Sequence, residues 1–205
     1  MNSDKTLYYV LDPMCSWCWG FAKTWKHLKH TLPNEIHIQH VMGGLASDNE
    51  EPMSDDMRSY IQKNWQKIET TIPGVKFNYD FWKKCAPRRS TYPACRAVIA
   101  IRRQKPTLEA KMIELIQKAY YLQAKNPSND STLIKLASGL DINLEKFAKN
   151  LNDNKTQQIF HGDITLAKKL GATGFPSLFF QNQAHIHCLQ IDYNNPQAIL
   201  KQIIT

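Results

Sequence analysis

Two cysteines three residues apart, Cys15 and Cys18, are the side chains of this sequence with the clearest chemical potential. Such a pair can close a disulfide across one turn of a helix, or supply half of a structural zinc site. Zinc would need two more ligands, and the remaining candidates are only loosely spaced: Cys85, Cys95, His185 and Cys188. We therefore predict redox chemistry and no metal. Two buried cysteines without chemistry remain a further alternative.

The residues around the pair predict a strand that turns into a helix. Leu7 to Leu11 is a short apolar run typical of a buried strand, and Asp12-Pro13 ends it. Apolar side chains then recur with helical spacing at Phe21, Trp25 and Leu28. Cys15 would lie at the helix start, where free N–H groups and the helix dipole favour a thiolate. We predict Cys15 as the nucleophile and Cys18 as the more buried resolving thiol.

A second position of interest is Phe175-Pro176, ahead of a β-prone run near the C-terminus. Proline cannot donate a hydrogen bond to a strand ladder, so in sheets it occupies strand starts, edges or bulges. The peptide bond before it is either cis, which is rare and usually purposeful, or an ordinary trans bond. Both readings stay open at this point, and we expect this segment to form the other half of the site.

Strand patterns at both ends of the chain predict one small α/β core. Residues 35–42 read as a second strand, so that the N-terminal part forms a βαβ unit with parallel strands. Residues 175–180 and 184–191 predict a hairpin, and residues 195–204 a closing helix. The fold class is therefore α/β, with βαβ and ββα units joined by a long helical insertion.

The middle of the chain is helical in its periodicity. Helices are predicted from Ser54, from Pro93, from Thr107, over 131–137, over 144–151 and over 155–170. Thr107 would cap a helix that turns Leu122 inward, and Gly171 would end the last helix. We therefore predict an α/β domain of residues 1–44 and 171–205, interrupted by a helical domain of residues 45–170.

The composition narrows the possible locations and partners. No apolar run is long enough to span a membrane, and the polar N-terminal residues leave no room for a signal peptide before the first strand. We expect a cytoplasmic protein, in which a Cys-x-x-Cys pair is more often catalytic than a structural staple. The formal net charge is +8, but the basic residues are scattered and no nucleic-acid motif accompanies them. We expect no nucleic-acid or membrane partner; the oligomeric state stays open.

Taken together, these motifs resemble the DsbA-like branch of the thioredoxin superfamily. The resemblance rests on Cys-Ser-Trp-Cys after a strand, a long helical insertion, and Gly-Ala-Thr-Gly-Phe-Pro-Ser-Leu before a terminal hairpin. It is closest to the cytoplasmic FrnE-like proteins, and it implies a thioredoxin fold with a helical insertion. It also implies that Cys15 attacks, that Cys18 resolves, and that Pro176 is a cis-proline packed opposite them. The backbone of Phe175 would hydrogen-bond an extended substrate segment.

Two features depart from that pattern. DsbA has a histidine between its cysteines, whereas this chain has Ser16-Trp17, which brings no positive charge. Asp12 precedes the pair, and a nearby negative charge opposes thiolate formation. We therefore predict a milder oxidant than DsbA. Trp17, Trp19 and Phe21 would line an apolar docking surface for substrate or, equally, pack in the core.

The predicted function is thiol–disulfide exchange with protein or small thiol and disulfide substrates, as an oxidase, reductase or isomerase. No cofactor need be bound, although glutathione could serve as co-substrate. The resemblance extends to kappa-class glutathione transferases and hydroxychromene-carboxylate isomerases, so a glutathione-dependent transferase or isomerase is the alternative. A redox-sensing or binding module without turnover is a third reading. Cys85 or Cys95 could form an auxiliary redox pair.

Overall fold

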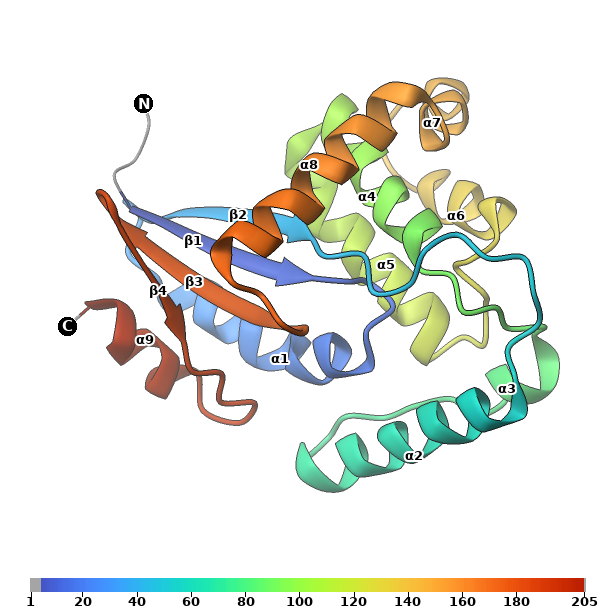
Figure 1. Cartoon of the computed structure of the whole chain (residues 1–205), viewed down its shortest axis with the longest axis horizontal. Coiled ribbons are helices and arrows are strands. Elements are labelled where there is room, and N and C mark those ends of the chain that lie inside the picture. The colour runs from blue at the N-terminus through green and yellow to red at the C-terminus, as the bar shows by residue number, and fades with distance from the viewer. Residues whose placement is uncertain (1–4, 205) are drawn as a thin grey trace.

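The computed structural model describes residues 5–204, so the N-terminal segment Met1 to Asp4, on which the leader prediction partly rests, lies outside it. Its strands form one four-stranded sheet in the order β2-β1-β3-β4 (Figure 1). They are β1 Lys5–Leu11, β2 His37–Met42, β3 Ser177–Asn182 and β4 His185–Leu189. β1 pairs parallel with β2 and antiparallel with β3, which pairs antiparallel with β4. Strands from the N-terminal and C-terminal parts of the chain are thus paired in one sheet.

The central strand β1 supplies side chains to two separate cores, because successive residues of a strand point to opposite faces. Leu7, Tyr9 and Leu11 face the larger core, together with α1 Ser16–Thr31 and α9 Pro196–Ile204. Val10 faces a smaller core with Val41, Phe179 and Ala167 of α8 Asn154–Leu170. The sheet is therefore covered by α1 and α9 on one face and by α8 on the other (Figure 1).

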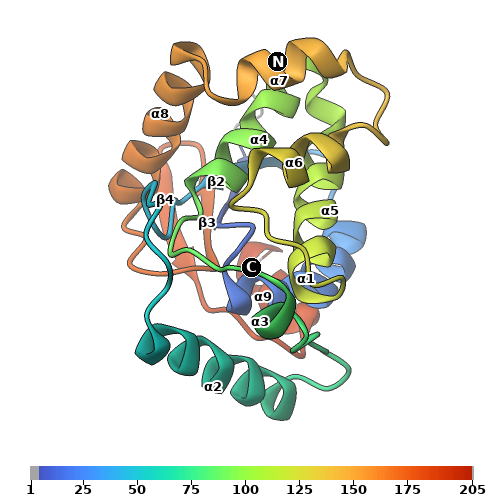
Figure 2. The same cartoon turned by 90° about the vertical axis from the view of Figure 1, so that its right-hand side faces the viewer.

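The segment between β2 and β3 is helical, as predicted. Besides α8 it contains α2 Asp55–Thr71, α3 Phe81–Lys84, α4 Tyr92–Gln104, α5 Glu109–Tyr121, α6 Asp130–Ala137 and α7 Leu144–Leu151. α4 is the central helix of this group, because every residue from Pro93 to Ile101 is buried. α2 is set apart from the others and runs across one end of the molecule (Figure 2). It packs against α1, which carries the cysteines.

A partly buried ionic network attaches the helical segment to the sheet. Arg102 of α4 donates to Glu109 at 2.6 Å, to Asp163 of α8 at 3.0 Å, and to the backbone carbonyl of His40 in β2 at 3.1 Å. Asp163 also accepts from the backbone N–H of Met42 at 2.9 Å. Charged groups in low-dielectric surroundings need such complete pairing. The network therefore fixes α4 and α8 against the edge strand β2.

Most predicted elements are present, with four corrections. Leu122 was predicted to face inward, but it follows the end of α5 and is 40% exposed. At the other end, α5 does not start at a Thr107 cap: a 3-10 turn over Pro106–Leu108 precedes it. Proline at 106 fits the first turn, where no N–H donor is needed. β3 begins at Ser177, after Pro176, since the proline has no N–H for the ladder. The short helix α3 was not predicted, because four residues carry too little periodicity.

The predicted stop signal of α8 is confirmed in detail. Gly171 caps the helix in the left-handed conformation, with φ of 87°, which costs glycine little. The α/β fold class with βαβ and ββα units around a helical insertion is also confirmed, whereas the domain boundaries at residues 44 and 171 stay a prediction. None of the helices in residues 5–204 has the length and apolar character needed to cross a membrane.

Candidate active site

Cys15 and Cys18 lie at the start of α1, as predicted. Cys15 is the N-cap residue of the helix, with extended backbone, and its carbonyl accepts the N–H of Trp19 at 3.1 Å. The preceding turn is closed by a hydrogen bond from the Cys15 N–H to the Asp12 carbonyl at 3.0 Å. Cys15 retains 6% exposure, whereas Cys18 has none. An incoming disulfide can therefore reach only Cys15.

Burial changes the acidity of the second thiol. The pKa of Cys18 is raised well above its ordinary value, chiefly because burial disfavours the thiolate, and further by the adjacent Cys15 and the charge of Asp12. The ring of Tyr9 lies in the same apolar surroundings, and its pKa is raised for the same main reason. Cys18 is therefore a protonated thiol at neutral pH.

The Phe175-Pro176 segment faces the cysteines from the far end of the sequence. The peptide bond between the two residues is cis, which settles the alternative left open by the sequence. The Sγ of Cys15 donates to the carbonyl oxygen of Phe175 at 3.3 Å, across 160 residues of chain. A Cβ built on Gly43 would come within 2.0 Å of the Phe175 ring, so only glycine leaves room for this ring. The end of β2 therefore also determines the position of the segment.

Asp12 has a structural role that its position in the sequence does not reveal. Its carboxylate is fully buried and accepts hydrogen bonds from the backbone N–H of Met14 at 2.8 Å, from that of Leu45 at 2.7 Å and from the Thr91 hydroxyl at 2.6 Å. The thiol of Cys95 lies 3.4 Å from it. Burial raises the pKa of Asp12 despite these donors. Asp12 therefore attaches the loop that bears Cys15 to the helical segment.

Ser16 links α1 to α2. Its hydroxyl accepts a hydrogen bond from the indole N–H of Trp65 at 3.0 Å. Trp65 has no exposed surface and is surrounded by rings from several elements, namely Phe77, Tyr79, Phe81, Trp82, Tyr120 and Tyr121. A large packed aromatic cluster resists displacement. The cluster therefore holds the first turn of α1 in place through the hydrogen bond to Ser16.

A cavity of about 190 Å³ opens beside Cys15. Met14 of the loop before α1 and Ser16 and Trp17 of its first turn form one wall, and Phe175 forms another. The remaining walls come from the helical segment: Leu45, Met53, Tyr60, Ile61, Asn64, Arg88, Arg89, Ser90, Thr91 and Tyr120. The insertion thus provides most of the surface that a substrate would meet.

Only one of the three aromatic residues proposed for docking faces this cavity. Trp17 lines it and contacts the ring of Tyr193, with centroids 5.2 Å apart. Phe21 is fully buried on the core side of α1, so for this residue the core-packing alternative is the observed one. Trp19 stacks on Tyr121 and donates to the Lys76 carbonyl at 3.1 Å, which makes it a packing residue as well.

Several cavity residues were not assigned a role from the sequence. Arg88, Arg89, Ser90 and Thr91, from the loop before α4, line the cavity. Tyr60 of α2 also lines it and is 61% exposed. The one available signal was the adjacency of two arginines ahead of a buried helix. Their distance from Cys15 along the chain hides their proximity in space.

The remaining cysteines do not join the pair. All five thiols are free, and Cys85 donates to the Ala124 carbonyl at 3.1 Å while Cys95 contacts Asp12, so these two are not bonded to each other. Cys188 is exposed on β4. Within residues 5–204 no group of three or more His, Cys, Asp and Glu side chains is arranged to hold a metal ion.

Comparison with solved structures finds other proteins with the same fold. A solved structure of a candidate protein disulfide isomerase from Nitrosomonas europaea matches with a TM-score of 0.84 at 24% identity, over 96% of this chain and 94% of that one. The cytosolic disulfide reductase DsbM from Pseudomonas aeruginosa matches with a TM-score of 0.74 at 24% identity, over 90% and 89% of the two chains. At these identities the likeness establishes the shared fold.

Sequence comparison finds a second group of relatives. The ClpXP adapter protein SpxH of Bacillus subtilis is 22% identical over 181 residues, which are 87% of this chain and 59% of that protein. SpxH of Halalkalibacterium halodurans is 22% identical over 203 residues, 97% of this chain and 66% of its own length. The chain thus spans about 60% of the length of these curated relatives. A family model described as thioredoxin matches residues 8–202. Since that model covers nearly the whole chain, the chain belongs to the thioredoxin family, and its fold is shared with solved structures of DsbA-like proteins.

Proposed function

We propose that this protein is a thiol–disulfide oxidoreductase that acts through Cys15 and Cys18. The observation that carries the proposal is the position of the Cys15 sulfur, at the N-terminus of α1, in a cavity and 3.3 Å from the Phe175 carbonyl. A thiolate there benefits from the free N–H groups of the helix. Cys18 lies one helical turn further on and is shielded from solvent. This is the asymmetry between attacking and resolving thiols that exchange requires.

In the reducing direction the reaction has two steps. The Cys15 thiolate attacks one sulfur of a substrate disulfide, which forms a mixed disulfide and releases the other substrate sulfur as a thiolate that takes a proton from water. Cys18 then loses its proton and attacks the Cys15 sulfur. The second substrate thiol leaves, and two electrons have passed from the cysteine pair to the substrate, leaving a Cys15–Cys18 disulfide. A low-molecular-weight thiol such as glutathione, acting as co-substrate, would reduce the pair again.

The same steps in reverse make the protein an oxidase, and alternation between them an isomerase. The absence of a positive side chain at Ser16-Trp17 supports a milder oxidant than DsbA. The solved structure of DsbM, which shares this fold, is named as that of a cytosolic protein, and we propose the same compartment for this protein. Membranes, nucleic acids and metals have no part in the proposal.

Substrate binding is proposed for Phe175, Pro176 and Trp17. The Phe175 carbonyl already serves as a hydrogen-bond acceptor for Cys15, and an extended substrate backbone would use the same short segment. Main-chain hydrogen bonds recognise backbone and not side chains, so protein substrates and small disulfides can both be accepted. Trp17 offers an apolar face at the edge of the cavity.

The decisive experiment is a redox titration of the Cys15–Cys18 couple in glutathione buffers, with insulin reduction measured on the same samples. We expect a two-electron couple and insulin turnover, both lost in Cys15→Ser. The potential will assign the direction of catalysis. Absence of a couple, or of any reaction with disulfides, would refute the proposal.

A glutathione-dependent transferase or isomerase remains the alternative within the same fold. A structure of DsbM with glutathione matches this chain with a TM-score of 0.71 at 23% identity. Such an enzyme needs one activating residue near glutathione and would not require a second cysteine. Cys18→Ser separates the two functions, because a transferase would keep its activity in this variant and an oxidoreductase would lose turnover.

The relatives named ClpXP adapter protein support a second candidate function, as a protein-binding adapter. In that case the cavity and the cysteines would regulate binding instead of catalysing exchange. The test is degradation of a reporter substrate by purified ClpXP with the oxidised or the reduced protein added. Acceleration that depends on redox state, without insulin turnover, would favour the adapter over the enzyme.

A further inference from the structure

The described part of the chain has a second, larger cavity next to the proposed active site. Its volume is about 660 Å³, within the usual range of ligand-binding pockets. Met53 and Arg88 line both cavities, so the two share a wall. A substrate attached to Cys15 can therefore extend from the first cavity toward the second.

The second cavity is predominantly basic. Four cations line it, Arg58, Lys84, Arg88 and Lys125, against one carboxylate, Glu50. We call it the basic pocket. Acidic partners of three cations are solvent-exposed: Glu50 lies 2.9 Å from Arg88, Asp80 lies 2.7 Å from Lys84, and Asp55 lies 3.7 Å from Arg58. Exposed ion pairs of this kind contribute little and exchange readily for another carboxylate.

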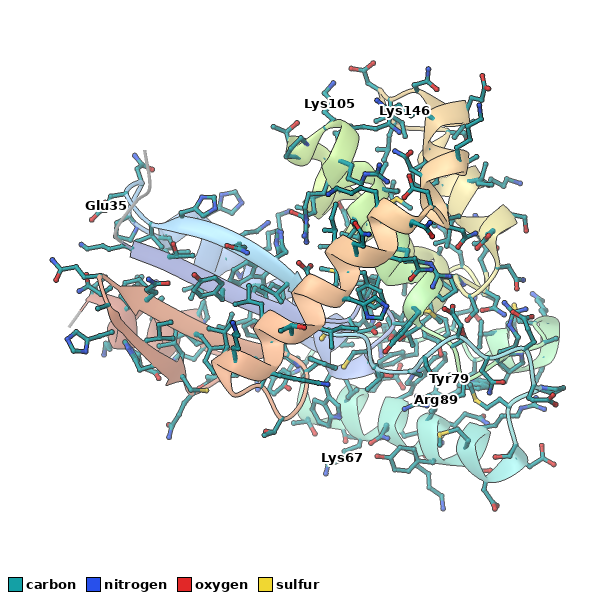
Figure 3. The ribbon with its side chains drawn as sticks, turned by 45° about the horizontal axis from the view of Figure 1, so that its top comes forward. Glu35, Lys67, Tyr79, Arg89, Lys105 and Lys146 are labelled. Atoms are coloured by element: carbon teal, nitrogen blue, oxygen red, sulfur yellow. The ribbon has the colours of Figure 1, made fainter. Side chains whose placement is uncertain are left out.

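Two consecutive arginines have unused capacity for hydrogen bonds or ion pairs: Arg88, which lines both cavities, and Arg89, which lines the cavity beside Cys15. Arg88 is held by Glu50 and by the Ser128 carbonyl, yet its buried Nε has no hydrogen-bond partner within the described residues. Buried donors are rarely left unpaired unless a ligand or water completes them. Arg89 lines the cavity with Cys15 and has no ion pair among the residues that the structure describes. In Figure 3, Arg89 lies on the side of α2 that faces the rest of the molecule. Lys67, which belongs to α2, points outward from that helix.

We propose that the enzyme selects polypeptide substrates with acidic residues flanking the reacting cysteine, whose carboxylates bind Arg89 in the active-site cavity and the cations of the basic pocket. This inference rests on the proposed oxidoreductase function and adds its substrate class. Guanidinium groups are well suited to carboxylates, which they bind through paired hydrogen bonds. A cleft lined by one sign of charge also concentrates substrates of the opposite sign and accelerates encounter.

A polypeptide fits this surface better than glutathione does, although both offer carboxylates. The two carboxylates of glutathione would be paired by Arg88 and Arg89 alone. The basic pocket supplies further cations and more than three times the volume of the active-site cavity. The exposed ring of Tyr60 at the rim adds apolar contact area that only a longer ligand reaches.

The test uses three peptides that differ only in the residues flanking one cysteine, which are Glu, Gln or Lys, each activated as a 2-pyridyl disulfide. The reduced enzyme is mixed with each peptide, and no external reductant is needed. Because the exposed thiol of Cys188 also reacts, attack by Cys15 is the release of 2-thiopyridone beyond that given by Cys15→Ser. We expect the Glu peptide to react about tenfold or more faster than the Lys peptide, and the advantage to shrink with added salt.

Variants assign that preference to the two cavities. Arg89→Glu, and Lys84→Glu with Lys125→Glu, should each reduce the Glu-to-Lys rate ratio severalfold. Lys84 and Lys125 are exposed, so these changes do not endanger folding. Lys67→Glu makes the same change of charge away from both cavities and should keep the ratio. Equal rates for all peptides, or an equal effect of Lys67→Glu, would overturn the inference while leaving the oxidoreductase function intact.

Two further arms complete the test. The first arm replaces the peptides with oxidised glutathione. If its reduction depends on Arg89 and the changes at Lys84 and Lys125 alter the rate with no peptide, the site recognises the carboxylates of glutathione. The polypeptide proposal is then wrong. Binding of the unactivated Glu peptide is measured by fluorescence anisotropy with Cys15→Ser. If no peptide reacts with the wild-type enzyme, the oxidoreductase proposal fails. If the Glu peptide nevertheless binds, and Arg89→Glu weakens that binding, the acidic-peptide site is supported independently of the oxidoreductase function. If the Glu peptide does not bind, the acidic-peptide site is refuted as well.

Discussion

The Cys15 sulfur donates to the backbone carbonyl of Phe175 at 3.3 Å, although 160 residues separate the two in the chain. The contact exists because β1 and β3 are adjacent strands, with Val10 opposite Ser177. The loop after β1 and the loop before β3 therefore leave the sheet at the same end. The proposed active site lies where these two loops meet the helical segment.

Loss of the resolving thiol should trap the reaction halfway. In Cys18→Ser, attack by Cys15 proceeds but the mixed disulfide cannot be released internally, so we expect a covalent adduct with substrate and almost no turnover. Intact-protein mass spectrometry after mixing with a peptide disulfide measures the adduct. Cys188→Ser, which removes an exposed thiol on β4, should behave as wild type. Full turnover by Cys18→Ser would argue for a glutathione transferase instead.

Gly43 controls the position of Phe175. A methyl group at this position would lie 2.0 Å from the Phe175 ring, so Gly43→Ala must displace the ring and the neighbouring Pro176. Overpacking of this kind costs about 1–3 kcal/mol of the free energy of unfolding, and we expect the rate of attack by Cys15 to fall with it. Urea unfolding and peptide-disulfide kinetics measure the two effects.

Gly162 provides the matched control for that substitution. It lies within α8 with no atom close to an added Cβ, so Gly162→Ala should stabilise the protein by about 0.5–1 kcal/mol and leave kinetics unchanged. If Gly43→Ala behaves like Gly162→Ala, the close approach to Phe175 has no functional consequence.

The hydrogen bond between Trp65 and Ser16 should be visible as an energetic coupling. Ser16→Ala leaves the buried indole N–H without a partner, which costs roughly 1–3 kcal/mol. Once Trp65→Phe has removed that N–H, the same serine change should cost much less. A double-mutant cycle in urea therefore should give a coupling of about 0.5–3 kcal/mol. If the two substitutions have additive effects on the free energy of unfolding, α2 and α1 are not coupled through this contact.

Asp12 should raise the pKa of Cys18 through its negative charge, as its position in the sequence led us to expect for the pair. In Asp12→Asn this charge is lost, so the pKa of Cys18 should decrease and its thiolate should appear at lower pH. Ultraviolet absorbance of the thiolate, followed against pH in Cys15→Ser, reports it. Asp141→Asn removes an almost fully exposed carboxylate and serves as the control. An unchanged Cys18 titration would show that Asp12 has only its structural role.

The buried thiol also predicts a pH dependence of stability. The pKa of Cys18 in the folded state is raised above the ordinary value of 9.0, mainly by burial, so the native state keeps a proton that the unfolded chain releases. The reduced protein should therefore lose stability as the pH rises above about 9, toward the folded-state pKa. The oxidised protein has no proton on Cys18 and should lose less. Urea midpoints of both forms at about pH 7 and about pH 10 measure the difference.

Local patterns in the sequence were sufficient for much of the fold. The apolar run at Leu7 to Leu11, the helical spacing after Cys18 and the glycine stop at Gly171 each correspond to an observed element. These signals are short-range, because strand alternation, helical periodicity and cap chemistry depend on residues only a few positions apart. The proposed redox residues were recognised for the same reason: their spacing and flanking elements are contiguous in the chain.

Only the tertiary structure decided what surrounds those residues. Phe21 and Trp17 share one helix and one residue class, yet one is in the core and the other lines the cavity. Asp12 was expected as a nearby charge, and it proves to be a buried acceptor for Leu45 and Thr91. Arg89 reaches the cavity from a loop of the insertion. Such roles depend on which distant segments pack together, and packing is set by the sum of many weak contacts that no local pattern encodes.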